Sequence, residues 1–345
     1  MIRVDLRSDT VSHPSPEMRK AMAEAEVGDD VYGDDPTVNR LQDLAAEKLS
    51  MEAGLFVTSG TQGNLVSMLT HCQRGDAVAL GEMSHIYNAE AGGTSVLGGI
   101  AMRILPNEKS GVISAEAIRT AGAPGDYHKS PVKVLAIENT QNGAGGTAIT
   151  PEQTAVMVGA ANELGLKVHV DGARIFNSAV AQNIPASELA RGVDSLTFCL
   201  SKGLACPIGS VVVGSRDFIE EADRWRKMLG AGMRQVGIIA AAGIVALDSM
   251  IDRLAEDHAN ATKLAEGLAE YPDVDIDMES VQTNIVRFAV PAGVGKPFAA
   301  AMYEEGVYMN AADSALRLVP HYGIDSEDID FTLLAVKKAM AVATA

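Results

Sequence analysis

Three segments of this chain place a chemically useful group directly after an apolar, strand-like run. Residues 59–64 (SGTQGN) open a predicted helix, and their small side chains let the backbone close around a ligand. The start of a helix offers unpaired N–H groups and a positive dipole end, which suits a phosphate. Asp171 follows the run 167–170, and Lys202 follows the run 195–200. A carboxylate can face a ligand nitrogen, and a lysine desolvated by apolar neighbours becomes a nucleophilic amine.

Each segment also has an ordinary structural interpretation. Residues 59–64 could be a plain helix cap, Asp171 could cap a turn, and most lysines are solvated surface groups. Together, however, the three match the needs of pyridoxal phosphate. The helix start would hold the phosphate, Asp171 would keep the ring nitrogen protonated, and Lys202 would form the Schiff base. We therefore predict that these groups meet at one cofactor site.

The elements that must position these groups alternate along the chain. Short apolar or β-branched runs occur at 53–58, 76–80, 101–105, 132–138, 167–170, 195–200 and 210–213. Helix-like stretches such as 61–72, 114–121 and 151–164 separate most of them. This alternation predicts an α/β fold with a mostly parallel, doubly wound sheet covered on both faces. Ligands of such sheets bind outside the carboxyl ends of the strands, which is where the three groups fall.

The pattern changes in the last third of the chain. Residues 232–271 look wholly helical, and shorter elements follow them. Strands are expected at 283–290 and 315–320, and helices at 297–305 and 326–343. We interpret residues 1–249 as a large cofactor-binding domain with an N-terminal arm, and residues 250–345 as a smaller α+β domain.

Composition excludes several classes of function. The 345 residues carry 28 Lys and Arg against 45 Asp and Glu, for a formal net charge of −17. Such an acidic surface disfavours nucleic acid and anionic membranes as partners. No apolar run is long enough for a membrane span, and the first ten residues carry charges where a signal peptide needs an apolar stretch. The three cysteines lack metal-ligand spacing, so we expect no metal and a reducing cytoplasm.

Seven segments, in order and nearly end to end, resemble the L-threonine aldolase family of fold-type-I pyridoxal-phosphate enzymes in the aspartate-aminotransferase superfamily. They are LRSDTV at 6–11, GDDVYGDDPTV at 28–38, SGTQGN at 59–64, HIYNAEAGG at 85–93, HVDGARIFNSAVA at 169–181, SKGLACPIGSVVVG at 201–214 and GAGMRQVGIIAAAG at 230–243. Any one is moderately specific, and the ordered set makes a strong match.

The resemblance implies roles at matching positions around the cofactor. Lys202 would carry the cofactor, Asp171 would pair with the pyridine nitrogen, and Arg174 would reach both cofactor and substrate carboxylate. Gly60 and Thr61 would bind the phosphate, and His85 would stack on the ring. Without the family, a buried structural role would be the better interpretation of His85.

Other positions are implied to hold the substrate or to cross a subunit interface. Ser8 and Arg317 would complete the grip on the carboxylate, with Arg317 coming from the small domain. Tyr32 and Arg234 would be donated by a second subunit, which implies a homodimer and, in this family, usually a tetramer. The family often reads ENTH after the central strand, but this chain has Gln141 at the last position.

The implied reaction is the reversible retro-aldol cleavage of L-threonine, L-allo-threonine and related β-hydroxy-α-amino acids to glycine and an aldehyde. His85 or His128 is the candidate base, since imidazole titrates near working pH, and His128 could also touch substrate. The alternatives are another lyase of this fold, such as a β-eliminating lyase or a phenylserine aldolase, and a non-catalytic cofactor-binding protein. A nicotinamide dehydrogenase is disfavoured because no GxGxxG follows the first strand.

Overall fold

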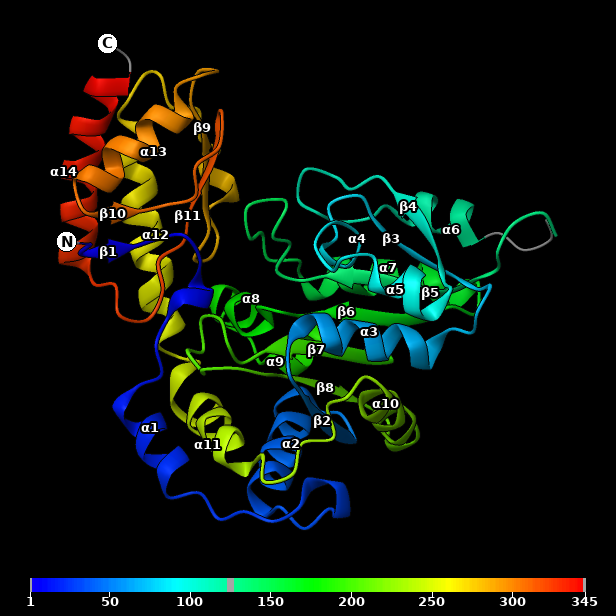
Figure 1. Cartoon of the computed structure of the whole chain (residues 1–345). Coiled ribbons are helices and arrows are strands. Elements are labelled where there is room, and N and C mark those ends of the chain that lie inside the picture. The colour runs from blue at the N-terminus through cyan, green and yellow to red at the C-terminus, as the bar shows by residue number, and fades with distance from the viewer. Residues whose placement is uncertain (1, 123–126, 344–345) are drawn as a thin grey trace.

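A computed structural model describes residues 2–122 and 127–343 of the chain. Figure 1 shows a central sheet with helices on both faces and, beside it, a second body that carries both chain ends. The sequence prediction of a mostly parallel α/β fold is confirmed. No helix within the described residues is long and apolar enough to cross a membrane.

The central sheet has seven strands in the order β2-β8-β7-β6-β5-β3-β4. They are β2 (Ala53–Val57), β3 (Ala77–Gly81), β4 (Ala101–Leu105), β5 (Val132–Glu138), β6 (Lys167–Asp171), β7 (Ser195–Cys199) and β8 (Ser210–Gly214). Strand β8 is antiparallel to both of its neighbours, whereas the other pairings are parallel. The carboxyl ends of β5, β6 and β7 therefore lie side by side at one edge.

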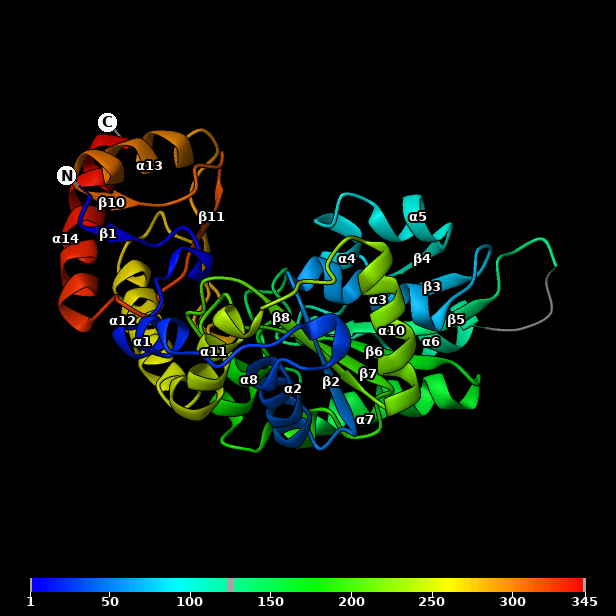
Figure 2. The ribbon, with the colours of Figure 1, turned by 60° about the horizontal axis from the view of Figure 1, so that its bottom comes forward.

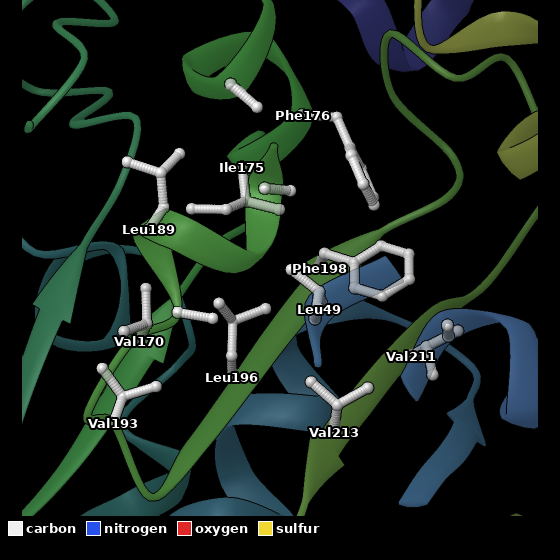
Figure 3. Packing of buried hydrophobic residues seen from close by; sticks show 14 of the residues in the cluster. Leu49, Val170, Ile175, Phe176, Leu189, Val193, Leu196, Phe198, Val211 and Val213 are labelled. Carbon is white, nitrogen blue, oxygen red and sulfur yellow. The ribbon is translucent and has the colours of Figure 1, made fainter. Parts of the chain in front are cut away.

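Strands β6 and β7 present different chemistry to the two faces of the sheet, because side chains alternate along a strand. Val170 and Leu196 belong to the large core on the face covered by α8 and α9 (Figure 3). The helices that contribute to this core include α1 (Pro16–Ala23), α2 (Pro36–Leu49), α6 (Ala115–Gly122), α7 (Pro151–Glu163), α8 (Ile175–Gln182), α9 (Ala186–Leu189) and α11 (Gly237–Val245). His169, Asp171 and Ser195 point to the opposite face, beneath α3.

The opposite face is covered by α3 (Gly60–His71), α10 (Arg216–Met228) and the short helices α4 (His85–Asn88) and α5 (Gly93–Gly98). Helix α3 packs against β7 very closely. A Cβ atom on Gly63 would lie 2.4 Å from the Thr197 side chain, so glycine is required there. This close approach brings the first turns of α3 to the carboxyl ends of β6 and β7.

Helix starts follow the local signals in the sequence. Ser15, Asp35 and Thr150 cap α1, α2 and α7, and a proline follows each cap in the first turn. Thr150 and Gln153 form a reciprocal capping box. Short 3-10 turns occur at η1 (Asp9–Val11), η2 (Asp30–Tyr32) and η4 (Met278–Ser280).

The second body has its own hydrophobic core. It contains β9 (Val286–Ala289), β10 (Val307–Tyr308), β11 (Ala315–Leu318), α12 (Leu254–Ala269), α13 (Gly295–Glu304) and α14 (Ser326–Ala343). Strand β1 (Val4–Asp5) pairs in parallel with β10, and Val4 and Leu6 are buried in this core. The N-terminal strand thus packs with the C-terminal part of the chain, as Figure 2 also shows.

The expected uninterrupted helix over 232–271 is wrong. Helix α11 begins only at Gly237, continues into a π-helical turn over Ala246–Met250, and is separated by residues 251–253 from α12. The physical reason is a change of core: Leu254 still packs in the large core, whereas Ala261 packs in the second one. The break lets the chain pass from one body to the other.

Candidate active site

Three strand ends and one helix start meet at the carboxyl edge of the sheet. Asp171 is the last residue of β6, and Lys202 lies in the turn that joins β7 to β8. Lys202 is half-buried, and its carbonyl accepts hydrogen bonds from the Ser12 hydroxyl at 3.2 Å and from Ala205 N–H at 2.8 Å. The left-handed conformation of Ala205 (φ 60°) closes this tight turn. The N-terminal arm therefore lies directly against the predicted cofactor lysine.

The start of α3 has free donors. Ser59 caps the helix, and its hydroxyl accepts from Gln62 N–H at 3.1 Å. Among the described residues, no hydrogen bond occupies the N–H groups of Gly60 and Thr61. A Cβ atom on Gly60 would lie 2.8 Å from the Cys199 sulfur, so the backbone passes tightly over the end of β7. Two unpaired donors at a positive helix end have the chemistry of a phosphate cradle.

Asp171 is a buried carboxylate supported by neutral donors. It is 3% exposed and accepts from Asn64 Nδ2 at 2.9 Å and from Ala173 N–H at 3.2 Å. No described cationic side chain lies within ion-pair distance of it. A buried anion without a cation is costly, so this position suits a ligand that brings a positive charge.

His85 lies beside Asp171 and is held by a second carboxylate. Its Nδ1 is 2.9 Å from Glu90 Oε1, and the same oxygen accepts from Asn64 Nδ2 at 2.8 Å. The Glu90 hydrogen bond outweighs burial and raises the pKa of His85, while burial raises the pKa of Glu90. One ligand atom each from His85, Glu90 and Asp171 lies within 4.8 Å of the others, so this corner could also receive a cation.

Glu138, the last residue of β5, accepts hydrogen bonds from the backbone next to the site. Its two oxygens accept from His85 N–H at 2.7 Å and from Asn142 N–H at 2.9 Å. Burial, and then the nearby Asp171 charge, raise the pKa of Glu138 to about 7. Glu138 was not expected at the site from the sequence, although it pairs in register with Asp171 at the carboxyl ends of β5 and β6.

Arg174 is held by a carboxylate that sequence analysis also missed. Its Nε and Nη2 atoms donate to the two oxygens of Asp9 at 2.6 and 2.7 Å, and Asn284 donates to Asp9 at 3.2 Å. Burial opposes the charge on Asp9, but the Arg174 guanidinium outweighs it and holds the pKa of Asp9 well below its usual range. Only the position of Asp9 next to Ser8 in the LRSDTV segment could have drawn attention to it.

Arg317, on β11 of the second body, faces the same region. It donates to Asn142 Oδ1 at 2.9 Å and to the Arg7 carbonyl at 3.3 Å. Burial, and then the positive charge of Arg174, lower the pKa of Arg317. Two guanidinium groups that repel each other define a place where an anion would be stabilised. Ser8 lies close by as the cap of the 3-10 turn next to Asp9.

His128 is not brought to this edge. It is exposed, and its ring lies against that of Tyr127 in a tilted arrangement, with centroids 4.0 Å apart, ahead of β5. Residues 127–131 lead into the amino end of β5, whereas Lys202 and Asp171 lie at the carboxyl ends of their strands. Within one chain, His128 therefore lies toward the amino ends of the strands, whereas the site lies at their carboxyl ends.

Tyr32 and Arg234 are also apart from the other predicted residues. The Tyr32 side chain is 77% exposed at the end of η2. Arg234 is half-exposed and pairs with Asp29 at 2.8 Å. No contact described here joins either residue to Lys202.

Gln141 packs inside its own turn. It is buried, and its side-chain oxygen accepts from Gly143 N–H at 2.5 Å. Its side chain also fills the space next to Gly111, where an added Cβ would lie 2.3 Å from it. The amide at this position thus supports the loop that carries Asn142.

Comparisons with known proteins show the family to which the chain belongs. A family model described as beta-eliminating lyase matches residues 5–291. Low-specificity L-threonine aldolase 1 of Arabidopsis thaliana is 40% identical, with 99% of this chain and 97% of that protein covered. The low specificity L-threonine aldolase of Escherichia coli K12 is 45% identical, with 94% of this chain and 96% of that protein covered.

A solved structure described as Leishmania major threonine aldolase superposes with a TM-score of 0.83 at 19% identity. The match covers 97% of this chain and 99% of that one, which shows a common fold. The resemblance found in the sequence is thereby confirmed. This chain belongs to the beta-eliminating lyase family, and the Arabidopsis and Escherichia coli relatives named above are threonine aldolases.

Proposed function

We propose that this chain is a pyridoxal-phosphate-dependent aldolase that reversibly cleaves L-threonine, L-allo-threonine and related β-hydroxy-α-amino acids to glycine and an aldehyde. The observation that carries the proposal is the meeting of a free helix start, the buried Asp171 carboxylate and Lys202 at one sheet edge, near Arg174 and Arg317. Sequence identity of 40% and 45% to two curated threonine aldolases, over nearly the full length of the chain, supports the same activity.

The described residues fit the cofactor. The unpaired N–H groups of Gly60 and Thr61 would hold its phosphate, and Asp171 would hold the proton on its ring nitrogen. Lys202 would carry it covalently, and His85 would lie against its ring. When bound, pyridoxal phosphate supplies an electron sink for the electron pair released from the Cα–Cβ bond.

The two arginines orient the substrate. Arg174 uses Nε and Nη2 on Asp9, which leaves Nη1 to donate to a substrate carboxylate. Arg317 approaches the same place from the second body, with its Nη1 on Asn142. A carboxylate held between two guanidinium groups is restrained in rotation, which sets the Cα–Cβ bond in the direction that cleavage requires.

His85 is the base that we propose for the β-hydroxyl proton. Its Nδ1 hydrogen-bonds to the Glu90 carboxylate, which can only accept, so Nδ1 of the neutral ring carries the hydrogen. Nε2 then has a free lone pair and can take up the hydroxyl proton. His128 could act only from a second copy of the chain, because its own subunit places it at the other edge of the sheet.

Product analysis tests the proposal. Purified protein supplied with pyridoxal phosphate and L-threonine should release glycine and acetaldehyde in equal amounts. Lys202→Ala should abolish this turnover, and the exposed Lys129→Ala serves as a lysine control. Formation of ammonia and a 2-oxo acid would instead support a β-eliminating lyase. Binding of the cofactor without any product would support a non-catalytic protein.

We further propose a homo-oligomer, a dimer that shares active sites and assembles into a tetramer in the cytoplasm. Exposed Tyr32, together with Arg234 on the neighbouring loop, supports an interface at this surface. Mixing Arg234→Ala subunits with Lys202→Ala subunits should restore activity, because hybrids would contain one intact shared site. Hybrids that form without activity above either parent would contradict the shared site.

A further inference from the structure

A row of hydrogen-bonded polar side chains runs beneath α3, from Asp171 back toward the amino end of β7. His169 Nε2 is 3.1 Å from Asn64 Oδ1, and His169 Nδ1 is 2.8 Å from the Ser195 hydroxyl. That hydroxyl is 2.7 Å from Nε2 of His71, the last residue of α3. Asn64, His169 and Ser195 are at most 1% exposed, so water cannot substitute for these partners.

The two carboxylates at one end determine where every hydrogen in the row lies. Asn64 Nδ2 faces both Asp171 and Glu90, at 2.9 and 2.8 Å, so the amide must donate there and present its oxygen to His169. His169 Nε2 must therefore carry a hydrogen, which leaves Nδ1 as an acceptor. Ser195 then donates to His169 and accepts from His71 Nε2–H.

We propose that His169, Ser195 and His71 are positioning residues that act through Asn64 to hold the Asp171 carboxylate in one fixed orientation. Every donor in the row points toward the carboxylates, and aligned hydrogen bonds in a dry interior strengthen one another. A reversed Asn64 amide would place its oxygen against two carboxylates. The row therefore admits one arrangement only.

Burial keeps the two imidazoles neutral, as the arrangement requires. Burial lowers the pKa of His169 to about 3 and that of His71 to about 4. Two charges act on His71: Asp194, which favours its protonated form, and Lys167, which opposes it. Asp194 and Lys167 form an ion pair with each other at 2.7 Å, so their opposite effects on the pKa of His71 largely cancel.

The significance of the row rests on the proposed role of Asp171 toward the cofactor ring. His169→Leu removes the donor to Asn64 and should weaken pyridoxal phosphate binding about tenfold in a titration of the cofactor-free chain. His169→Gln keeps a donor and an acceptor at the corresponding positions and should recover most of that loss. Ser67→Ala is the matched control, because Ser67 is buried on α3, the helix that carries Asn64, and its hydroxyl donates to the Gly63 carbonyl of that helix. Equal binding by His169→Leu and the wild type would overturn the proposal, as would His169→Gln binding as weakly as His169→Leu.

The tautomers can be measured directly in the wild-type chain, which avoids any variant that fails to fold. Histidine labelled with ¹⁵N in the ring, assigned with His71→Gln and His169→Gln, reports each nitrogen separately. At pH 7.5, both rings should show a protonated Nε2 and an unprotonated Nδ1, with or without cofactor. Ser195→Ala should leave His169 as a mixture of tautomers. A protonated Nδ1 at His169 in the wild type would contradict the proposed arrangement of hydrogen bonds, whatever the outcome of the product analysis.

Discussion

Two carboxylates of this site are equally buried but are stabilised in opposite ways. Asp9 is paired with the guanidinium of Arg174, so its charge is already neutralised within the chain. Asp171 is held by the Asn64 amide and a backbone N–H, with no described cation at ion-pair distance. The difference teaches that a buried ion pair fixes structure, here an arginine and the N-terminal arm, whereas a carboxylate kept on neutral donors remains available for a cationic ligand.

The largest expected effect on the rate of threonine cleavage comes from replacing Asp171, the carboxylate without an internal ion pair. Asp171→Asn should lower the rate of threonine cleavage by more than about a hundredfold, because an amide cannot hold the proton on a ring nitrogen. The free energy of unfolding of the cofactor-free chain should change by less than about 1 kcal/mol, since no internal ion pair is lost. Near-normal turnover would mean that the carboxylate is only a turn cap.

Removing the paired carboxylate should act on stability instead. Asp9→Asn leaves the Arg174 guanidinium buried without a counter-ion and should lower the free energy of unfolding by about 3 kcal/mol in a urea titration. The pKa of Asp9 lies below its unfolded value, so its contribution is fully present above about pH 4 and is lost on acidification. The variant should therefore lose less stability than the wild type as the pH falls. If Asp9→Asn and Asp171→Asn destabilise the chain equally, the distinction between the two carboxylates is wrong.

The smallest expected effect concerns the charge beside His85. Glu90 raises the pKa of His85, so the neutral imidazole needed as base becomes scarce as the pH falls. Glu90→Gln keeps an acceptor oxygen but removes the charge, and it should move the acidic limb of the kcat/KM profile to lower pH by about one unit or less. The exposed Glu82→Gln is the control and should leave the limb in place. An unshifted limb in Glu90→Gln would show that His85 is not the titrating base.

The sequence predicted which candidate site residues lie at strand ends. Asp171 and Lys202 follow short apolar runs, and the rule that parallel strands share a carboxyl edge suffices to bring them together. Gly60 could be placed for the same reason, because it opens the helix after β2. Local pattern and general topology carry this information without any knowledge of side-chain packing.

The supporting residues could not be predicted in that way. Asp9, Asn64 and Glu138 are polar residues whose burial depends on partners far away in sequence, and a lone carboxylate or amide has no periodic signal. Strand β1 has only two residues, too few to show alternation before it pairs with β10. The break after α11 depends on which core each turn packs against, which the uniform apolar pattern of the segment conceals.

Lys202 is proposed to carry the cofactor at the edge where Asp171 receives its ring. Borohydride reduction of the wild-type protein loaded with pyridoxal phosphate, followed by peptide mass mapping, would identify the lysine that carries it. We expect one modified lysine, Lys202, with loss of the visible absorbance band, and no modification at that position in Lys202→Ala. Modification mainly at another lysine, or no stable modification of a fully loaded wild type, would show that Lys202 does not carry the cofactor.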